Sequence, residues 1–251
     1  MARAIYRQIA EDLREQIITG KLQPGRQLPT EPNLAAEYGA SRSTIRLAVS
    51  LLIHQGMVET RQGVGTYVSE PPKPLTVVLS REENWQAGEH ADAALQPVGG
   101  KTDGPTAERF QTETADANAE VAAALNLPRG SQVVVRRSYL YLGKDPWSLV
   151  VSFYPIDIVK GTELEHAGRN MKGASFVLAE HGHEPLSYRH DIYARMPDAN
   201  EQTFFQLSPA IPVTVVNRIT FDATQPVRLT TYVYRADRLR LRHDIGSIPR
   251  P

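Results

Sequence analysis

Three arginines and several hydroxyl side chains gather in one short part of the sequence. Two of the arginines fall within the run Ser41–Arg46 (SRSTIR), and the third is Arg61. A guanidinium group can bind the edge of a guanine or a phosphate, and hydroxyl groups donate to phosphate oxygens. From residue 39 to residue 65 these arginines stand against a single carboxylate, Glu59. This composition indicates contact with a polyanion such as a nucleic acid.

Two predicted helices, joined by a tight turn, position the arginines. Residues 34–38 have apolar side chains at helical spacing, and Gly39 suits the left-handed residue that often ends a helix. Ser41 is a good N-cap for a second helix, because its oxygen can accept from a free backbone N–H. The apolar face of that second helix is formed by Ile45, Val49, Leu52 and Ile53. The arginines and hydroxyls lie in its first turns, as in a helix that enters the major groove.

A hairpin is predicted directly after these helices. Residues 57–60 and 66–68 are rich in β-formers, and they flank a glycine-containing tip, Arg61–Gly65, that exposes Arg61 and Gln62. Glycine at such a tip lets the backbone approach a minor groove or a phosphate closely. The alternative is a small helical bundle with a surface hairpin.

The residues before the two helices also form a recognisable pattern. Residues 4–19 carry Ile5, Ile9, Leu13 and Ile17 at four-residue spacing, which predicts a helix that ends at Gly20. Pro24-Gly25 suits a type II turn. Thr30 is the expected N-cap of the next helix, with Pro32 in its first turn.

Together these segments resemble the winged helix-turn-helix domain of the GntR family of bacterial transcription regulators. The matching segments are Tyr6–Ala10, Gly20–Gly25, Leu28–Glu31, Ser41–Arg46, Gln55–Gly56 and Gly63–Val68. The resemblance implies a homodimer that binds a near-palindromic double-stranded DNA operator. The residues expected to contact DNA are Arg7, Thr30, Asn33, Ser41, Arg42, Ser43, Thr44, Arg46, Arg61, Gln62 and Gly63.

One position departs from the family pattern. The family often has arginine or lysine directly after the glutamate that opens the second helix, and here that residue is Pro32. We therefore expect one fewer charged contact per subunit and a weaker salt dependence of DNA binding. Asn33 can supply a neutral hydrogen bond instead.

Length and composition favour two ordinary domains. The chain has 251 residues, an apolar fraction of 41%, no cysteine and a formal net charge of zero. Disulfides, thiol nucleophiles and cysteine-bound zinc are excluded, and we expect no cofactor and no bound metal. No apolar run is long enough to span a bilayer, and the N-terminus lacks the pattern of a secretory signal. A cytoplasmic protein with no membrane partner is expected.

The domain boundary is expected at a proline-rich segment. Residues 1–69 form the predicted DNA-binding domain, 70–74 a stiff linker and 75–251 a second domain. Strands are predicted over 75–79, 105–113, 132–142, 146–154, 188–196, 213–222 and 227–239. Helices are predicted over 115–125, 175–181 and 198–207, with a helical turn at 156–160 and a polar loop over 81–105. Hairpins with inserted helices indicate an α+β fold with an antiparallel sheet.

Residues 74–245 resemble the UTRA effector-binding domain of the HutC subgroup, whose fold is shared with chorismate lyase. The resembling residues are Leu125, Leu127, Gly130, Arg137, Asp145–Pro146, Ser152–Pro155, Ser175–Gly182, Asp222, Pro226–Val227 and Tyr234–Arg238. The resemblance implies a domain that dimerises and binds a small effector. The rival architecture in this family is an all-helical effector domain, which the many β-branched runs disfavour.

The expected effector-binding residues are Arg137, Tyr139, Ser152, Ser175, Phe176, Arg228, Thr230, Tyr232 and Tyr234. Alternation along a strand puts Arg137 and Tyr139 on one face of their strand and Arg136 on the other, unless a bulge exchanges them. Ser175 is expected to cap a helix whose N–H groups could hold an anion. Arg228 and Val150 stand where amino-sugar-phosphate sensors of this group have a carboxylate, which suggests a more anionic ligand.

Three functions are compatible with these observations. The first is a repressor that an effector releases from its operator. The second is a ligand-independent silencer with the same fold. The third is an enzyme of the chorismate-lyase type, which we disfavour because His181 and His183 lack a third ligand or a catalytic partner in any recognisable spacing.

Overall fold

The computed structural model describes residues 5–61, 63–69, 74–79, 97–98, 106–166, 173–207, 211–243 and 245. The chain divides into two compact units, residues 1–73 with 196–211, and residues 74–195 with 212–251. The linker residues 70–73 lie outside the described part of the chain, so the predicted domain limits stay a prediction. No helix of the described segments is long and apolar enough to cross a membrane.

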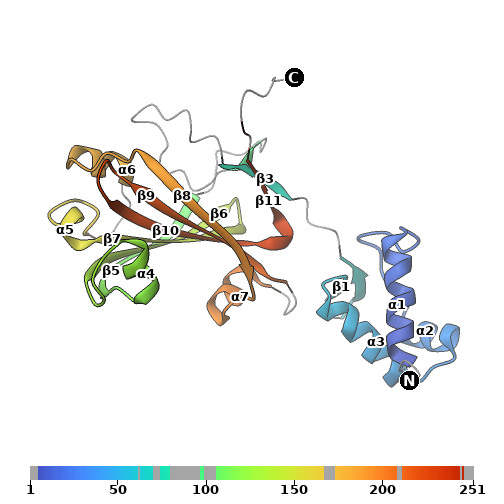
Figure 1. The fold of residues 1–251 in the computed structure, drawn as a ribbon. Coiled ribbons are helices and arrows are strands. Elements are labelled where there is room, and N and C mark those ends of the chain that lie inside the picture. The colour runs from blue at the N-terminus through green and yellow to red at the C-terminus, as the bar shows by residue number, and fades with distance from the viewer. Residues whose placement is uncertain are drawn as a thin grey trace. The chain divides into compact units, whose positions relative to one another are not determined.

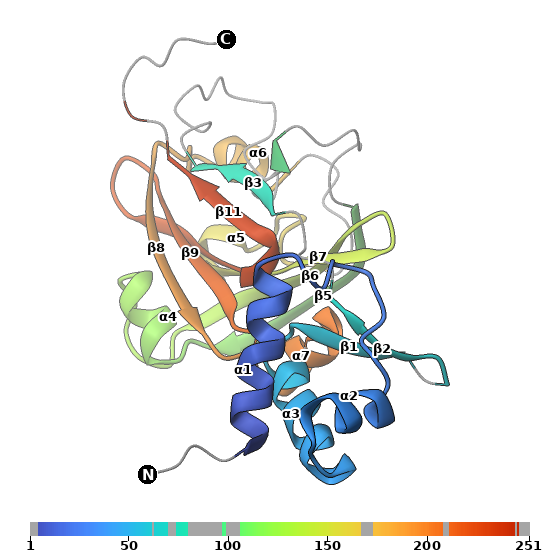
Figure 2. The ribbon, with the colours of Figure 1, turned by 90° about the vertical axis from the view of Figure 1, so that its right-hand side faces the viewer.

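Three helices and a hairpin make up the N-terminal part. The helices are α1 (Ile5–Ile18), α2 (Glu31–Tyr38) and α3 (Arg42–His54), and the hairpin strands are β1 (Val58–Arg61) and β2 (Gly65–Val68) (Figure 1). The β1–β2 hairpin projects from the three helices in Figure 2. This order confirms the predicted helix-turn-helix with its wing.

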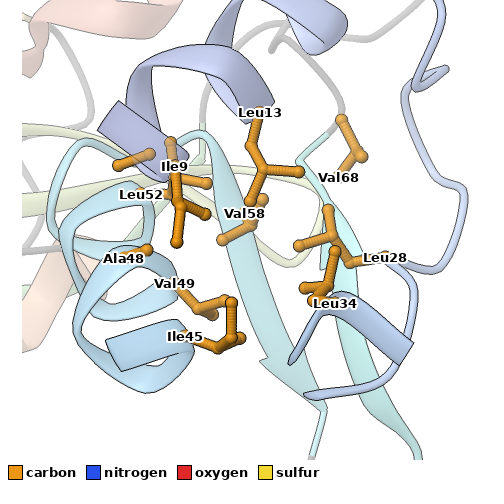
Figure 3. Packing of buried hydrophobic residues seen from close by; sticks show 11 residues of the cluster. Ile9, Leu13, Leu28, Leu34, Ile45, Ala48, Val49, Leu52, Val58 and Val68 are labelled. Carbon is orange, nitrogen blue, oxygen red and sulfur yellow. The ribbon is translucent and has the colours of Figure 1, made fainter. Parts of the chain in front are cut away.

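A single apolar cluster holds these elements together. Ile9 and Leu13 of α1 face Ile45 and Leu52 of α3, and all four side chains are almost fully buried (Figure 3). The four-residue spacing on α1 places its apolar side chains on one stripe, which is the reason the helix packs on α3. Each such side chain contributes roughly 1.5–3 kcal/mol when fully buried. The cluster fixes α3, and with it the direction in which its first turns point.

The second part is built on a six-stranded antiparallel sheet. Its order is β5–β6–β7–β10–β9–β8. The bounds are β5 (Thr106–Asp116), β6 (Gln132–Leu142), β7 (Asp145–Pro155), β8 (Ser187–Arg195), β9 (Val213–Phe221) and β10 (Pro226–Arg235). A smaller sheet has the order β11 (Leu239–Arg242), β3 (Leu75–Val78), β4 (Pro97–Val98), with β3 parallel to β11. The predicted α+β class with an antiparallel sheet is confirmed.

Helices and the small sheet cover the two faces of the large sheet. Helix α4 (Ala119–Ala124) packs on the face that carries Val133, Val135 and Leu229, which we call the α4 face. Helices α5 (Ile156–Val159) and α6 (Ala174–Glu180) pack on the opposite side, together with β3, and we call this the α6 face. Two further elements are α7 (Ala199–Phe205) and the 3-10 helix η2 (Ala236–Arg238).

Several predicted boundaries were wrong for identifiable reasons. Ala115 and Asp116 were expected in a helix but end β5, because Asn118 is the N-cap of α4 and accepts from the N–H of Val121 at 2.9 Å. The last long strand was expected to run to Leu239 but stops at Arg235, where η2 interrupts it. Most of the predicted loop 81–105 lies outside the described residues; within it, residues 97–98 form β4.

Candidate nucleic-acid interface and ligand-binding face

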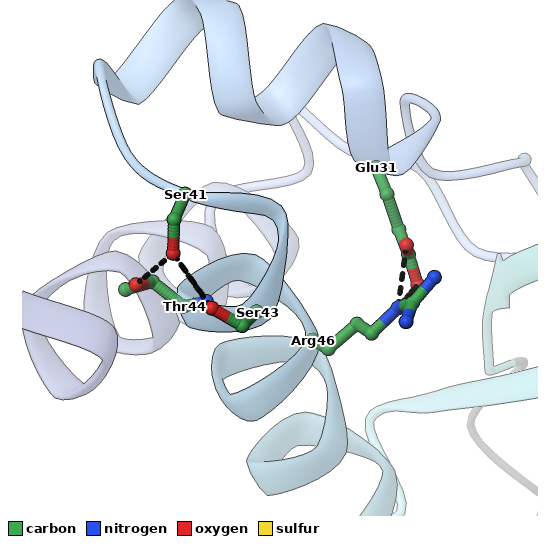
Figure 4. A network of polar contacts seen from close by, with 5 residues as sticks. All are labelled: Glu31, Ser41, Ser43, Thr44 and Arg46. Atoms are coloured by element: carbon green, nitrogen blue, oxygen red, sulfur yellow. Dashed lines mark hydrogen bonds and ion pairs between the residues drawn. The ribbon is translucent and has the colours of Figure 1, made fainter.

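The first turn of α3 is organised by one serine. Ser41 is the N-cap, and its Oγ accepts from the N–H of Thr44 at 3.1 Å. The same oxygen lies 2.8 Å from the hydroxyls of both Ser43 and Thr44 (Figure 4). Ser41 is therefore occupied by the helix itself, whereas the exposed Ser43 and half-buried Thr44 keep hydrogen-bonding capacity for a partner.

The two arginines of α3 are both exposed but differ in their contacts. Arg42 makes no ion pair with any described residue. Arg46 donates from Nε to both carboxylate oxygens of Glu31, at 2.8 and 3.1 Å (Figure 4). Its side chain is nevertheless 69% exposed. The ion pair orients Arg46 without burying it, so the basic surface that the sequence indicates is present.

The wing tip presents a third arginine. Nε and Nη2 of Arg61 both donate to Oε1 of Glu59, at 3.0 and 2.7 Å. The Arg61 guanidinium also lies 4.3 Å from the centroid of the Tyr67 ring. Gly63 has a φ of 73°, the left-handed conformation that glycine adopts without strain. Gln62, which was expected at the tip, lies outside the described residues.

The segment before α2 fixes the base of the wing. Leu28 donates its N–H to the carbonyl of Thr66 at 2.7 Å, and the side chain of Gln27 donates to the carbonyl of Val64 at 3.0 Å. Gly65 has a φ of 135°, which L side chains rarely adopt, and a Cβ there would lie 2.4 Å from Gln27 Nε2, so that side chain would have to move. These contacts hold the wing against the chain that leads into the helix-turn-helix.

The remaining predicted DNA contacts lie at the starts of α1 and α2. Thr30 is the N-cap of α2 without a side-chain cap bond, and Pro32 stands in the first turn as predicted. Asn33 is exposed beside them. Arg7 on α1 donates to the hydroxyl of Tyr6 at 3.1 Å. The structure thus joins the start of α2 to α3 through the Glu31–Arg46 pair, and it adds Glu31 to the residues that bear on the interface.

A row of polar side chains crosses the α6 face of the large sheet. The strand registers put Arg136, Ser152, Thr230, Arg218 and His190 opposite one another from β6 to β8. Residues opposite each other in antiparallel strands point to the same face. These five side chains therefore form one line on that face, which we call the polar row.

Hydrogen bonds connect several members of the polar row. The hydroxyls of Ser152 and Thr230 lie 3.0 Å apart. Arg136 donates from Nη1 to the carbonyls of Leu164 and His166, at 3.0 and 2.7 Å. The α6 face is therefore a preorganised polar surface and not a purely apolar one.

Arg218 is the most deeply buried cation of the polar row. Its side chain is 1% exposed, and its Nε donates to Nε2 of His190 at 2.9 Å. The rings of Tyr188 and Tyr232 lie 5.3 and 5.2 Å from its guanidinium. Burial, together with the positive charges of Arg218 and His243, lowers the pKa of His190 to about 4. His190 is thus neutral at pH 7 and can accept from Arg218.

A second buried arginine lies next to the row. Arg228 on β10 is 3% exposed and donates from Nη2 to the hydroxyl of Ser175 at 3.3 Å. It stands opposite Thr220 of β9, whose fully buried hydroxyl has no hydrogen-bond partner among the described residues. An unsatisfied buried hydroxyl is costly, so a polar group supplied from outside the chain would be stabilised here.

The structure divides the predicted effector residues between the two faces. Ser152, Arg228, Thr230 and the tyrosines of β10 lie on the α6 face, with Ser175 at the start of α6. Arg137 and Tyr139 lie on the α4 face, opposite Val151 and Leu149, and Arg137 forms an ion pair with Glu113. The expectation that Arg137 and Tyr139 share one site with the other effector residues was therefore wrong, because they lie on the opposite face of the sheet.

Three further details qualify the predicted site. Ser175 is not an N-cap, because Gly173 holds that position and Ser175 lies inside a helix of seven residues. Tyr234 is 1% exposed and packs against Trp147, with ring centroids 5.4 Å apart. Phe176 is 40% exposed on α6. Sequence reasoning did not identify Arg218 or Thr220, although an arginine within the β-branched run VTVVNRITF was a usable signal.

A hydrogen bond joins the segment that follows α6 to the β9–β10 turn. His183 Nδ1 lies 2.9 Å from Oδ2 of Asp222, whose other oxygen accepts from the backbone N–H groups of Thr224 and Gln225. Burial raises the pKa of Asp222, but the hydrogen bonds from His183, Thr224 and Gln225 outweigh it and lower the pKa to about 2.

No group of three or more potential metal ligands occurs within the described segments.

The Asp222 pKa predicts an acid-dependent loss of stability. Its folded value of about 2 lies below the ordinary value of 3.8, so the unfolded chain binds more protons between these two values. The contribution is complete above about pH 4 and is lost as the pH falls toward 2. Urea unfolding of Asp222→Asn should show lower stability than wild type at pH 7 and a smaller further loss between pH 4 and 2. Asp145→Asn, at an exposed residue, is the control; identical pH profiles for Asp222→Asn and wild type would contradict the assignment.

Comparisons with known proteins agree with both halves of this arrangement. Residues 5–68 match the family described as bacterial regulatory proteins, gntR family, and residues 102–240 match the UTRA domain. An HTH-type transcriptional regulator of Streptomyces coelicolor is 31% identical over 221 residues, which cover 86% of this chain and 82% of that protein.

Two further comparisons cover a shorter segment and nearly the whole chain. The mannosyl-D-glycerate transport/metabolism system repressor MngR of Escherichia coli K12 is 53% identical over 66 residues, which are 26% of this chain and 28% of that protein. The crystal structure of a protein described as a GntR-family transcriptional regulator superposes with a TM-score of 0.67 at 25% identity. It covers 98% of this chain and 99% of its own.

Proposed function

Because the chain belongs to the gntR family of bacterial regulatory proteins and is a DNA-binding transcription regulator with a UTRA domain, we propose that it is a repressor released by a small anionic effector. Its matched relatives are regulators and not enzymes, so turnover is not part of its function. A regulator of this kind acts on the bacterial chromosome, which supports a cytoplasmic location. The repressor assignment is supported by the 66 residues that are 53% identical to MngR, whose name describes it as a repressor.

The DNA-binding half contributes the first turns of α3 and the wing. Arg42 and Arg46 read base edges in the major groove, and Ser43 and Thr44 bond to phosphates or bases. Arg61 at the wing tip binds a phosphate or the adjacent minor groove. The formal net charge of zero is no obstacle, because Arg42, Arg46 and Arg61 are all exposed and fall within the short segment 42–61.

A homodimer doubles this interface. Two winged helices related by a two-fold axis meet a near-palindromic operator whose half-sites are about one helical turn, roughly 34–36 Å, or a multiple of it apart. A ligand that binds better to one arrangement of the two winged helices shifts the population toward it. If that arrangement misaligns the half-sites, the operator is released, and the coupling free energy is typically about 1–3 kcal/mol.

The polar row on the α6 face carries the proposal of an anionic effector. Arg218 in the row is 1% exposed, and Arg228 next to the row is 3% exposed. Guanidinium groups bind carboxylates and phosphates through charge-assisted hydrogen bonds, which are strong in a water-poor site. The hydroxyls of Ser152, Thr220 and Thr230 add uncharged donors for the rest of the ligand. The proposed site therefore contains Arg136 in place of Arg137 and Tyr139.

A thermal-shift screen coupled to a DNA-release assay tests the effector proposal. The screen covers organic acids, phosphorylated sugars and amino-acid breakdown products. A ligand at 100 times its Kd is expected to raise the melting temperature by roughly 5–10 °C. The same compound should dissociate the protein from its operator in a gel shift. Anions that bind without releasing DNA, or no anion that binds while a neutral compound does, would contradict the proposal.

A further inference from the structure

An ion pair between the half-buried Glu31 and the exposed Arg46 links the two helices of the helix-turn-helix. Glu31 is the first residue of α2, and both of its carboxylate oxygens accept from the same atom, Nε of Arg46 on α3. Pro32 follows Glu31 within the first turn of α2, where its fixed φ stiffens the backbone. The carboxylate of Glu31 is thus held by a rigid backbone and accepts from one nitrogen of Arg46.

Because Glu31 accepts from Nε of Arg46, the other N–H groups of the guanidinium determine which further hydrogen bonds Arg46 can donate. A guanidinium has five N–H groups, one on Nε and four on the two terminal amino groups. The terminal amino groups of Arg46 form no hydrogen bond with any described residue, and the side chain is 69% exposed. A guanine presents O6 and N7 to such a pair of parallel N–H donors in the major groove. The ion pair with Glu31 therefore orients the side chain and leaves the end that recognises a base available.

Arg61 at the wing provides an internal comparison. There Oε1 of Glu59 accepts from both Nε and Nη2, so the carboxylate occupies one whole edge of the guanidinium. The arginine also stacks on Tyr67, and its remaining amino group suits a single contact with a phosphate. Two glutamates thus hold two arginines in different ways, and only the Glu31 geometry preserves both terminal amino groups.

We infer that Glu31 is a positioning residue that holds Arg46 for bidentate contact with one guanine in each half-site and so determines sequence specificity. This inference rests on the proposed contact of α3 with the operator. Glu31 is expected to raise the affinity for the operator and to lower the affinity for unrelated DNA, through two physical effects. Preorientation of Arg46 favours the base pair that it fits, because less side-chain freedom is lost on binding. The negative charge of Glu31 opposes the phosphates of any duplex, which weakens non-specific binding.

The test compares Glu31→Ala, Glu31→Gln and the control Glu59→Gln, all as full-length protein. Wild type first selects duplexes from a randomised double-stranded DNA library. The base pair read by Arg46 is identified as the one at which Arg46→Ala loses selectivity. Fluorescence anisotropy then gives affinities for the selected duplex, for the duplex changed at that base pair, and for an unrelated duplex. Melting temperatures report folding.

Opposite changes on different duplexes are expected for Glu31→Ala. Discrimination at the Arg46 base pair should fall by roughly 5- to 150-fold, the range of one bidentate contact. Affinity for the unrelated duplex should rise. Glu31→Gln, which keeps one acceptor oxygen, should fall between Glu31→Ala and wild type. Glu59→Gln should raise affinity for unrelated DNA without altering discrimination at that base pair. Adding Glu31→Ala to Arg46→Ala should cause no further loss of discrimination.

Other outcomes would overturn the inference in distinguishable ways. Equal weakening on all three duplexes would mean that Glu31 only supports the fold. Unchanged discrimination with a normal melting temperature would mean that Arg46 needs no positioning. If wild type itself selects no motif, the proposed reading of DNA by α3 fails first, and the role of Glu31 fails with it.

Discussion

Replacing either Arg42 or Arg46 with alanine is expected to abolish sequence-specific DNA binding and to leave the folded protein and its oligomeric state unchanged. Each bidentate contact contributes roughly 1–3 kcal/mol of discrimination, and a homodimer makes each contact twice, so the expected loss is roughly 2–6 kcal/mol. Both side chains are exposed, and neither belongs to the apolar cluster between α1 and α3. The folded state should therefore lose little when one of them is removed.

The measurement is a gel-shift titration with the selected operator, accompanied by circular dichroism and size-exclusion chromatography. Arg14→Ala is the matched control, because Arg14 is an exposed arginine that forms an ion pair with Glu11, three residues earlier on the same helix α1. Its removal takes away the same charge at a site that is not expected to touch DNA. Operator affinity that is unchanged in Arg42→Ala and Arg46→Ala would reject the assignment of α3 as the reading helix.

Replacing Arg228 with methionine is expected to abolish effector release while DNA binding in the absence of effector is retained. Methionine fills a similar length without charge, so the change removes the charge-assisted bond to the ligand from a site that is 3% exposed. Removing a hydrogen bond to a charged group costs roughly 1.5–3 kcal/mol, which corresponds to a 10- to 150-fold higher effector concentration for half-release.

Arg137→Met is the control for this second experiment. Arg137 is an arginine of the same sheet, but it lies on the α4 face and pairs with Glu113. Its replacement should leave the effector concentration for half-release unchanged. The reverse result, with Arg137→Met insensitive to effector and Arg228→Met normal, would move the site to the α4 face. Melting curves of both variants exclude loss of folding as the cause.

The N-terminal part could be predicted closely from the sequence because its signals are local. The spacing of Ile9 and Leu13, the left-handed Gly39 and the cap at Ser41 each act within one or two turns of chain. Helix boundaries therefore followed from residues near them. The wing followed in the same way from a glycine-containing tip between two short β-rich runs.

The ligand-binding face could not be predicted from local signals. Alternation along β6 shows that Arg136 and Arg137 point in opposite directions, but it cannot tell which of the two meets Ser152. That choice depends on the register between β6 and β7, which pairs Arg136 with Ser152. The same holds for β3, a strand that was expected, whose parallel partner β11 is more than 150 residues away in the chain.

Contacts between side chains on different elements were also beyond sequence reasoning. The bond between Arg46 and Glu31 joins residues 15 positions apart on two helices. The bond between Arg218 and His190 joins neighbouring strands 28 positions apart. Both depend on how the elements are packed. An arginine within a mostly buried strand is unusual enough to notice, whereas a glutamate at a helix start is common and gave no such signal.

Amide hydrogen exchange with and without the selected duplex tests the central claim most directly, because it reports which backbone segments the DNA covers. The account predicts slower exchange at residues 41–46 of the first turns of α3 and at residues 59–66 of the wing, with no protection centred on β6. Protection confined to the C-terminal sheet, or exchange in α3 and the wing that stays unchanged at saturating duplex, would contradict it.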